Sequence, residues 1–279
     1  MAVQELKSID ISSFTIISTG IAVLFSIILS ILITIGIGAL VPNSLVTIAY
    51  LIPTIVFGTI ISCIFTFFSV SYLYNVLSKR FSPIKLDIEE NYIKKVSPKE
   101  TGLIAGCIVL VMVLVVYFAL SLIIPLFLSS LITVMMYGSQ MNIATLTYQL
   151  LFLLSNPTFI AVGIIGSVII ISVFILLATY VYNILANSER GIIVELTKED
   201  KLTQLESLNP MNFGIAIGAI NLILNIIVGL IMVISGVPIS NALASILLSF
   251  VIAFIEGILI AIFYNFLGPR IGKLKVELE

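Results

Sequence analysis

One acidic side chain stands alone inside an apolar stretch of this sequence. Glu256 lies in a segment, 245–264, in which 13 of 20 residues are Leu, Ile, Val or Phe. Such a segment inserts into a bilayer in spite of one acid, because the apolar residues outweigh a cost on the order of 3 kcal/mol. Carboxyl groups at this depth are typical of proton carriers and of hydrogen bonds that join helices.

Two asparagines in the preceding apolar stretch are the natural partners of this acid. Asn221 and Asn225 lie four residues apart, so they share one face of a helix, and we expect them at a depth similar to that of Glu256. The hypothesis is that Glu256, Asn221 and Asn225 form a polar cluster inside a helix bundle. The pattern favours a functional pathway and a hydrogen-bonded helix contact about equally.

The sequence offers few other groups for catalysis. Histidine is absent, and the two cysteines, Cys63 and Cys107, lie in separate apolar stretches without metal-ligand spacing. No glycine-rich phosphate loop or dinucleotide fingerprint is present. We therefore expect a protein that is not an enzyme, with no cofactor and no metal site.

The elements that carry these residues follow from composition. The 279-residue chain is 60% apolar and 10% charged, with a mean hydropathy of +1.27, far from the range of soluble domains. Apolar runs of about 20 residues predict membrane-spanning helices. These runs cover 14–40, 53–78, 101–136, 157–187, 213–235 and 242–267.

The charges define an orientation. All 13 Lys and Arg residues fall at the N-terminus, in 79–100, in 188–212 and in the C-terminal tail, whereas 41–52, 137–156 and 236–241 contain none. Because cytoplasmic loops collect basic residues, this predicts a multi-pass cell-membrane protein with both termini cytoplasmic and the first helix as a signal anchor. Acids balance the bases on that face, so we expect no nucleic-acid binding.

A Tyr-Asn dipeptide ends three of the six apolar runs. The three pairs, called here the Tyr-Asn pairs, are Tyr74-Asn75, Tyr182-Asn183 and Tyr264-Asn265. Similar residues precede and follow each one, which predicts three parallel two-helix repeats within a single membrane domain, 1–279. The predicted repeats cover about 8–90, 95–198 and 207–279. The predicted fold class is an all-α integral membrane protein, with short cytoplasmic strands as an option.

Both ends of each repeat predict local structure. An N-capping residue, Asp10, Ser97 or Asn209, precedes each first helix. The tails IKLDI (84–88), IIVEL (192–196) and LKVEL (274–278) follow each second helix. These tails suit either strands that pair with one another or irregular segments along the membrane surface.

Structural roles are expected for the other patterns. We interpret the tyrosines of the Tyr-Asn pairs as anchors at the membrane interface and the asparagines as caps of the helix ends. The uncharged stretch 141–154 predicts a helix that lies in the outer interface or re-enters between spans. Small residues at four-residue spacing predict close helix packing. They are Ser26-Ser30-Thr34, Gly163-Ser167 and Gly214-Gly218.

The three segments around the Tyr-Asn pairs read YLYNVLSKRFSPIKLDI, YVYNILANSERGIIVEL and IFYNFLGPRIGKLKVEL. Each resembles an actinobacterial two-helix transmembrane domain family of unknown function. The resemblance covers some 25 residues a copy, with single glycines, Gly191 and Gly272, where that family has paired ones. It implies a similar folding unit and no mechanism.

Two functions remain open on the sequence. The first is a non-enzymatic scaffold or accessory subunit that sits in the lipid bilayer and contacts a membrane-protein partner or further copies of itself. The second is a secondary transporter or channel that uses Glu256. Against transport, the equivalent positions in the other repeats are Thr66 and Phe174, so the acid is not shared.

Overall fold

A computed structural model describes residues 3–40, 45–89, 91–137, 141–154, 156–199 and 201–279. Six of its described helices are long and apolar enough to cross a membrane. They match the predicted spans. A shorter helix covers 141–154, the uncharged stretch that was predicted to be helical. The α-helices are α1 (Ile11–Leu40), α2 (Leu45–Ser78), α3 (Pro98–Tyr137), α4 (Met141–Leu154), α5 (Pro157–Leu185), α6 (Pro210–Ile234) and α7 (Ile239–Ile271), and a π-helical segment, Ala186–Arg190, follows α5.

The chain forms two compact units. The larger contains Met1–Thr101 and Leu176–Glu279, and the smaller contains Gly102–Ile175. The division falls within the predicted middle repeat. Most of α3 and α5 lies in the smaller unit. All the strands named below lie in the larger unit.

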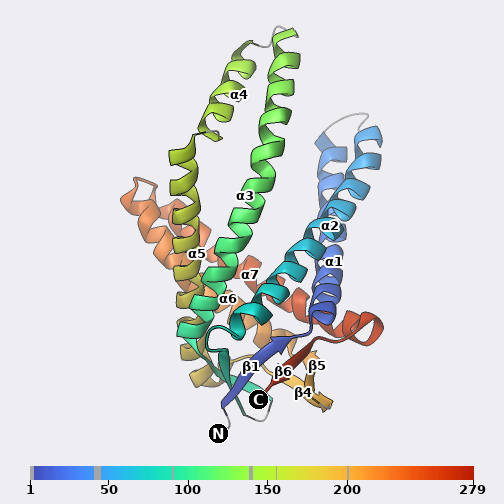
Figure 1. Ribbon diagram of the computed structural model, residues 1–279, viewed down its shortest axis with the longest axis vertical. Helices are drawn as coiled ribbons and strands as arrows, with labels where there is room; N and C mark the ends of the chain where they lie inside the picture. The colour runs from blue at the N-terminus through green and yellow to red at the C-terminus, as the bar shows by residue number, and fades with distance from the viewer. Residues whose placement is uncertain (1–2, 41–44, 90, 138–140, 155, 200) are drawn as a thin grey trace. The chain divides into compact units, whose positions relative to one another are not determined.

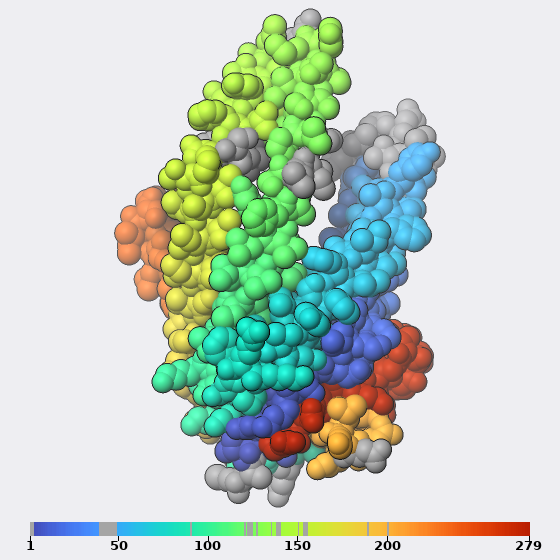
Figure 2. Space-filling model, in the orientation of Figure 1, coloured from blue at the N-terminus to red at the C-terminus, as the bar shows by residue number. Residues whose placement is uncertain are grey.

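The fold class "all-α" is incomplete, because the larger unit contains a sheet that joins strands from the whole chain (Figure 1). The strand order among the described residues is β3-β2-β1-β6-β5-β4. The blue N-terminal strand therefore lies against the red C-terminal one, as Figure 2 also shows. The strands are β1 (Val3–Ile9), β2 (Ile84–Glu89), β3 (Tyr92–Val96), β4 (Val194–Glu199), β5 (Leu202–Leu208) and β6 (Lys275–Leu278).

The three tails predicted as optional strands are β2, β4 and β6, but they do not pair with one another. Each pairs with strands that precede the first helix of a predicted repeat, namely β1, β3 and β5, and these three strands were not predicted. Backbone groups at a sheet edge need partners, and the segment before each helix supplies them.

The edges of the sheet meet. An antiparallel bridge joins Tyr92 of β3 to Ile193, the residue before β4. Two backbone hydrogen bonds accompany it, from Ile93 N to Ile192 O at 3.1 Å and from Val194 N to Asn91 O at 2.8 Å. The six strands therefore form a closed ring, called the strand ring below, which leaves no long open edge for aggregation.

Three of the strand pairings contain one register shift each, at equivalent positions. They are the pairings of β1 with β6, β2 with β3, and β4 with β5. The pairing skips one residue of β1, β3 and β5, which is Lys7, Lys94 and Glu206 respectively. An extra residue reverses the alternation of faces, so apolar positions three apart, such as Leu6 and Ile9, can face the same side.

Each skipped residue is charged and belongs to an ion pair. Lys7 lies 2.9 Å from Glu5, Lys94 pairs with Glu89, and Glu206 pairs with Lys273. The hydrogen bond from Lys7 holds the pKa of the partly exposed Glu5 carboxyl below its ordinary value, and the same contact raises the pKa of Lys7.

The core of the larger unit lies where the strands meet the helix ends. Ile17 of α1, Val194, Leu208 and the Ala261 and Tyr264 side chains of α7 are all buried together. The apolar residues of the strands thus pack against the helices that the strands connect, so sheet and helix ends stabilise one another.

The predicted small-residue contacts are only partly present. A Cβ on Gly214 would lie 2.9 Å from Phe254 O, and one on Gly218 would lie 3.1 Å from the Phe254 side chain, so α6 and α7 are in close contact. Ser26 and Ser30 are buried as well. Gly163, in contrast, has open space where a Cβ would lie.

Candidate functional site

The asparagine of each Tyr-Asn pair binds the strand that precedes the first helix of its predicted repeat, which is α1, α3 or α6. The Asn75 side chain donates to Ile9 O and accepts from Ile9 N, both at 2.8 Å. Asn183 makes the same two bonds with Val96, and Asn265 makes them with Leu208. A primary amide has one donor and one acceptor spaced like those of a peptide, so each asparagine satisfies both backbone groups of one residue.

The tyrosine hydroxyl of each pair binds the same strand three residues earlier. Tyr74 donates to Leu6 O at 2.6 Å, Tyr182 donates to Ile93 O, and Tyr264 donates to Leu205 O. The three tyrosine residues are buried, with 3–6% of their surface exposed. A buried phenol requires such a partner, because an unsatisfied hydroxyl would cost free energy.

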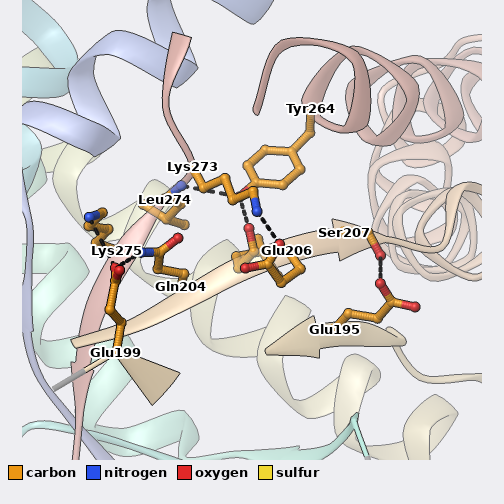
Figure 3. Close-up of polar contacts among 10 residues, drawn as sticks. Glu195, Glu199, Gln204, Glu206, Ser207, Tyr264, Lys273, Leu274 and Lys275 are labelled. Atoms are coloured by element: carbon orange, nitrogen blue, oxygen red, sulfur yellow. Dashed lines mark hydrogen bonds and ion pairs between the residues drawn. The ribbon is translucent and has the colours of Figure 1, made fainter. Parts of the chain in front are cut away.

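The Tyr264 hydroxyl takes the place of a ladder hydrogen bond (Figure 3). Leu205 N donates directly to Leu274 O at 2.9 Å, but the reciprocal bond is interrupted. Leu274 N donates instead to the Tyr264 hydroxyl at 3.1 Å, and that hydroxyl donates to Leu205 O. The tyrosine is therefore a component of the strand ring as well as of α7.

Tyr182 has the same surroundings as Tyr264. Ile93 N donates to Ile192 O, while Ile192 N donates to the Tyr182 hydroxyl at 3.3 Å. Tyr74 donates to Leu6 O, and Leu6 is the register partner of Ile84 in β1 and β2. The same substitution of a hydroxyl for a ladder bond thus occurs between β3 and the segment before β4 and between β5 and β6.

These contacts correct the roles expected for the Tyr-Asn pairs. The tyrosines are buried against strands and are not exposed as interfacial anchors, and the asparagines hold strand residues in place of capping their own helices. Both expectations failed for one reason, since they treated each pair as local, and the residues of β1, β3 and β5 that it binds lie 57 to 89 residues away.

Capping follows the predictions at two of three positions. Asp10 accepts from Ser13 N at 3.2 Å, and Asn209 accepts from Asn212 N at 3.1 Å. The Ser97 hydroxyl instead accepts from Lys85 N at 3.0 Å, which ties the start of α3 to β2.

The outer charges of the ring add further side-chain contacts (Figure 3). Glu195 accepts a 2.7 Å hydrogen bond from Ser207 on the neighbouring strand, and Glu277 accepts one of 2.7 Å from Ser8. The third of these acids, Asp87, is the register partner of Lys95 in the pairing of β2 with β3. The acids that follow each Tyr-Asn pair are thus part of the strand ring.

The bridge that closes the ring depends on a glycine. The Tyr92 hydroxyl accepts from Gly191 N and donates to Ala186 O, the latter at 2.9 Å. A Cβ on Gly191 would lie 2.9 Å from Ile93 O and equally close to the Tyr92 ring. Only glycine fits this approach without movement of the backbone, and its place in the sequence gave no signal of that role.

The predicted polar cluster is not assembled. Asn225 donates to the Asn221 side chain at 2.6 Å, so the two asparagines bind one another. Glu256 is exposed and has no hydrogen bond or ion pair within the described residues. Gly257 packs against Gly214, and Asn221 therefore lies about 9 Å farther along the helix axes than Glu256. Close glycine contacts, and not distance from the helix ends, fix that register.

The described residues contain no group of three His, Cys, Asp or Glu side chains that could hold a metal ion. What the arrangement can do chemically is bind: it presents satisfied backbone groups, ion pairs and apolar helix faces. Comparison with models of protein families gave no match, and comparisons with curated proteins and with solved structures gave none of significance.

Proposed function

We propose that this chain is a multi-pass protein of the cell membrane, with both termini in the cytoplasm. Six long apolar helices support this. So does the confinement of the basic residues to the ends of those helices that adjoin the strands. The pairing of β1 with β6 independently supports the placement of both termini on the same side, because two terminal strands can pair only on one side of a membrane.

Three copies of a strand–helix–helix–strand repeat are part of the same proposal. The support is that each Tyr-Asn pair has equivalent strand partners and that the skipped charged residue recurs at one place in each copy. The likeness of the three segments to a two-helix family is consistent with such a repeat and adds no activity.

The function that we infer is that of a non-enzymatic scaffold or accessory subunit. One observation carries it: the polar residues that recur in the chain are engaged in holding strands to helix ends. The result is a frame, the strand ring, from which apolar helices extend with much of their surface exposed, as at Ile61, Leu247 and Ile234. Exposed apolar faces suit lipid and partner helices.

Transport through Glu256 is the weaker alternative. It requires the acid and the two asparagines to line one route, and the contacts of Asn221 and Asn225 with one another do not favour that arrangement. We keep it as the outcome to be tested if no partner is found.

The test is affinity purification of the full chain from native membranes in mild detergent, with quantitative mass spectrometry. The variants are Lys95→Glu and Lys198→Glu, which change exposed residues of the strand ring, and the control is Lys79→Glu, which is exposed at the end of α2. A stoichiometric partner that is lost with the ring variants and retained with the control supports an accessory subunit. A chain that purifies alone overturns it, and proton flux in liposomes with Glu256→Gln is then measured.

The orientation has its own test. Single cysteines at Lys95 and Met141, in a chain whose Cys63 and Cys107 are replaced by Ser, are labelled with a membrane-impermeant maleimide. Labelling of residue 95 only after the cells are opened, and of residue 141 in intact cells, is the expected result. The reverse pattern would contradict cytoplasmic termini.

A further inference from the structure

The helix that carries Glu256 has a covered face and an open face. Ala253, Gly257 and Ala261 are buried, and Gly257 lies against α6. The adjoining side is exposed and is called here the open face of α7. It consists of Leu248, Ile252, Ile255 and Glu256. The acid is therefore directed away from the helix that packs most closely against its own.

Among the residues that the structure describes, no base forms an ion pair with Glu256. Residues 8–78, 100–189 and 202–269 contain no Lys or Arg. On α7 itself the nearest base, Arg270, lies 14 residues away, about 21 Å along the axis. Arg270 is moreover engaged, since it donates to Phe266 O and stacks on the Phe266 ring with its guanidinium carbon 3.9 Å from the ring centroid.

Neither the smaller unit nor a second copy can supply the missing charge. Residues 102–175 contain no charged residue at all, whatever position that unit adopts. A second copy brings the same sequence, so its own helices offer no base at the depth of Glu256. An exposed acid within an apolar helix is costly in lipid unless it is paired. Such an acid is neutralised either by protonation or by a counter-charge, and a counter-charge has to come from a different protein.

We propose that the open face of α7 docks a membrane-spanning helix of another protein that carries a Lys or Arg side chain at the depth of Glu256. Leu248, Ile252 and Ile255 supply apolar packing around the pair. An ion pair within the membrane then gives the contact its specificity, because a helix without the base leaves the acid unpaired. This inference rests on the proposed accessory function and names the chemistry of its partner.

The test is photo-crosslinking in intact membranes from a benzophenone side chain at Ile252, with the same probe at the exposed Phe65 of α2 as the control. The expected adduct joins Ile252 to a span that contains Lys or Arg, as located by mass spectrometry. Glu256→Asp should retain at least half of the adduct, whereas Glu256→Gln and Glu256→Leu should reduce it at least tenfold. Glu256→Lys should abolish it, and exchange of the partner's base for Glu should restore it.

Four results would overturn the proposal: no adduct, adducts with lipid alone, adducts with a second copy, or full retention in Glu256→Gln. Chain levels in the membrane, measured for each variant, separate loss of the contact from loss of the protein. The outcome is distinct from that of the purification experiment. A partner that still co-purifies with Glu256→Leu and is lost with Lys95→Glu leaves the accessory function standing and removes this inference.

Discussion

The Asn265 side chain pairs with both backbone polar groups of Leu208, a residue 57 positions earlier in the chain. The contact joins the end of α7 to the strand that enters α6. Replacement by alanine leaves the N–H and C=O of Leu208 without their partner at a place with little access to water.

The first prediction concerns this contact. Asn265→Ala should lower the free energy of unfolding by about 2 kcal/mol, since two hydrogen bonds are lost. Thermal unfolding of the detergent-solubilised protein measures the change. Asn241→Ala, at an exposed position of α7, is the control. Equal melting temperatures for the two variants would mean that the pairing contributes nothing.

A second prediction uses two tyrosines of one helix. Tyr182 is 6% exposed with its hydroxyl in the strand ring, whereas Tyr180 is 51% exposed. Tyr182→Phe should destabilise the protein by about 1–2 kcal/mol, because Ile93 O and Ile192 N lose the hydroxyl between them. Tyr180→Phe should leave the melting temperature unchanged. An effect of Tyr180→Phe as large as that of Tyr182→Phe would argue against the ring contact.

The closed ring itself predicts a cross-link between the two ends of the chain. Ser8 and Glu277 are register partners in β1 and β6. Cysteines at both positions, with Cys63 and Cys107 replaced by Ser, should form a disulfide on mild oxidation, because paired strand residues have suitable Cα separations. After proteolysis of a connecting segment, a non-reducing gel should show the ends still joined. Ser8→Cys with Glu195→Cys is the control, and efficient cross-linking of that pair would contradict the strand order.

Packing of α6 on α7 gives a fourth prediction. Gly214→Ala places a methyl group 2.9 Å from Phe254 O and should destabilise the protein by about 1–3 kcal/mol, as overpacking does. Gly163→Ala meets open space and should be neutral or slightly stabilising. Melting temperatures in one detergent measure both. A Gly214→Ala protein as stable as the parent would show that the two helices can separate without cost.

The fifth prediction concerns acidity. The folded protein lowers the pKa of Glu5, chiefly through Lys7, so the charged carboxyl stabilises the fold above the unfolded pKa. This contribution should be lost as the pH falls through the folded pKa. Glu5→Gln should therefore melt below the parent protein at pH 7, and the difference should shrink at lower pH. A gap that is constant with pH would exclude the ion pair as its source.

The sequence by itself determined the helices of this protein and where its recurring residues lie. Apolar runs long enough to span a bilayer leave the backbone no alternative to helix, and caps such as Asn209 act within one turn. The three Tyr-Asn pairs were visible for the same reason, because recurrence is a property of order along the chain.

Tertiary structure alone decided what those residues bind. A strand such as β1 has meaning only beside β2 and β6, and the hydroxyl of Tyr264 acquires its role from Leu205, 59 residues earlier. The depth of Glu256 relative to Asn221 was likewise set by the contact of Gly257 with Gly214. Long-range pairing and helix register depend on which surfaces fit together, and no local pattern encodes that fit.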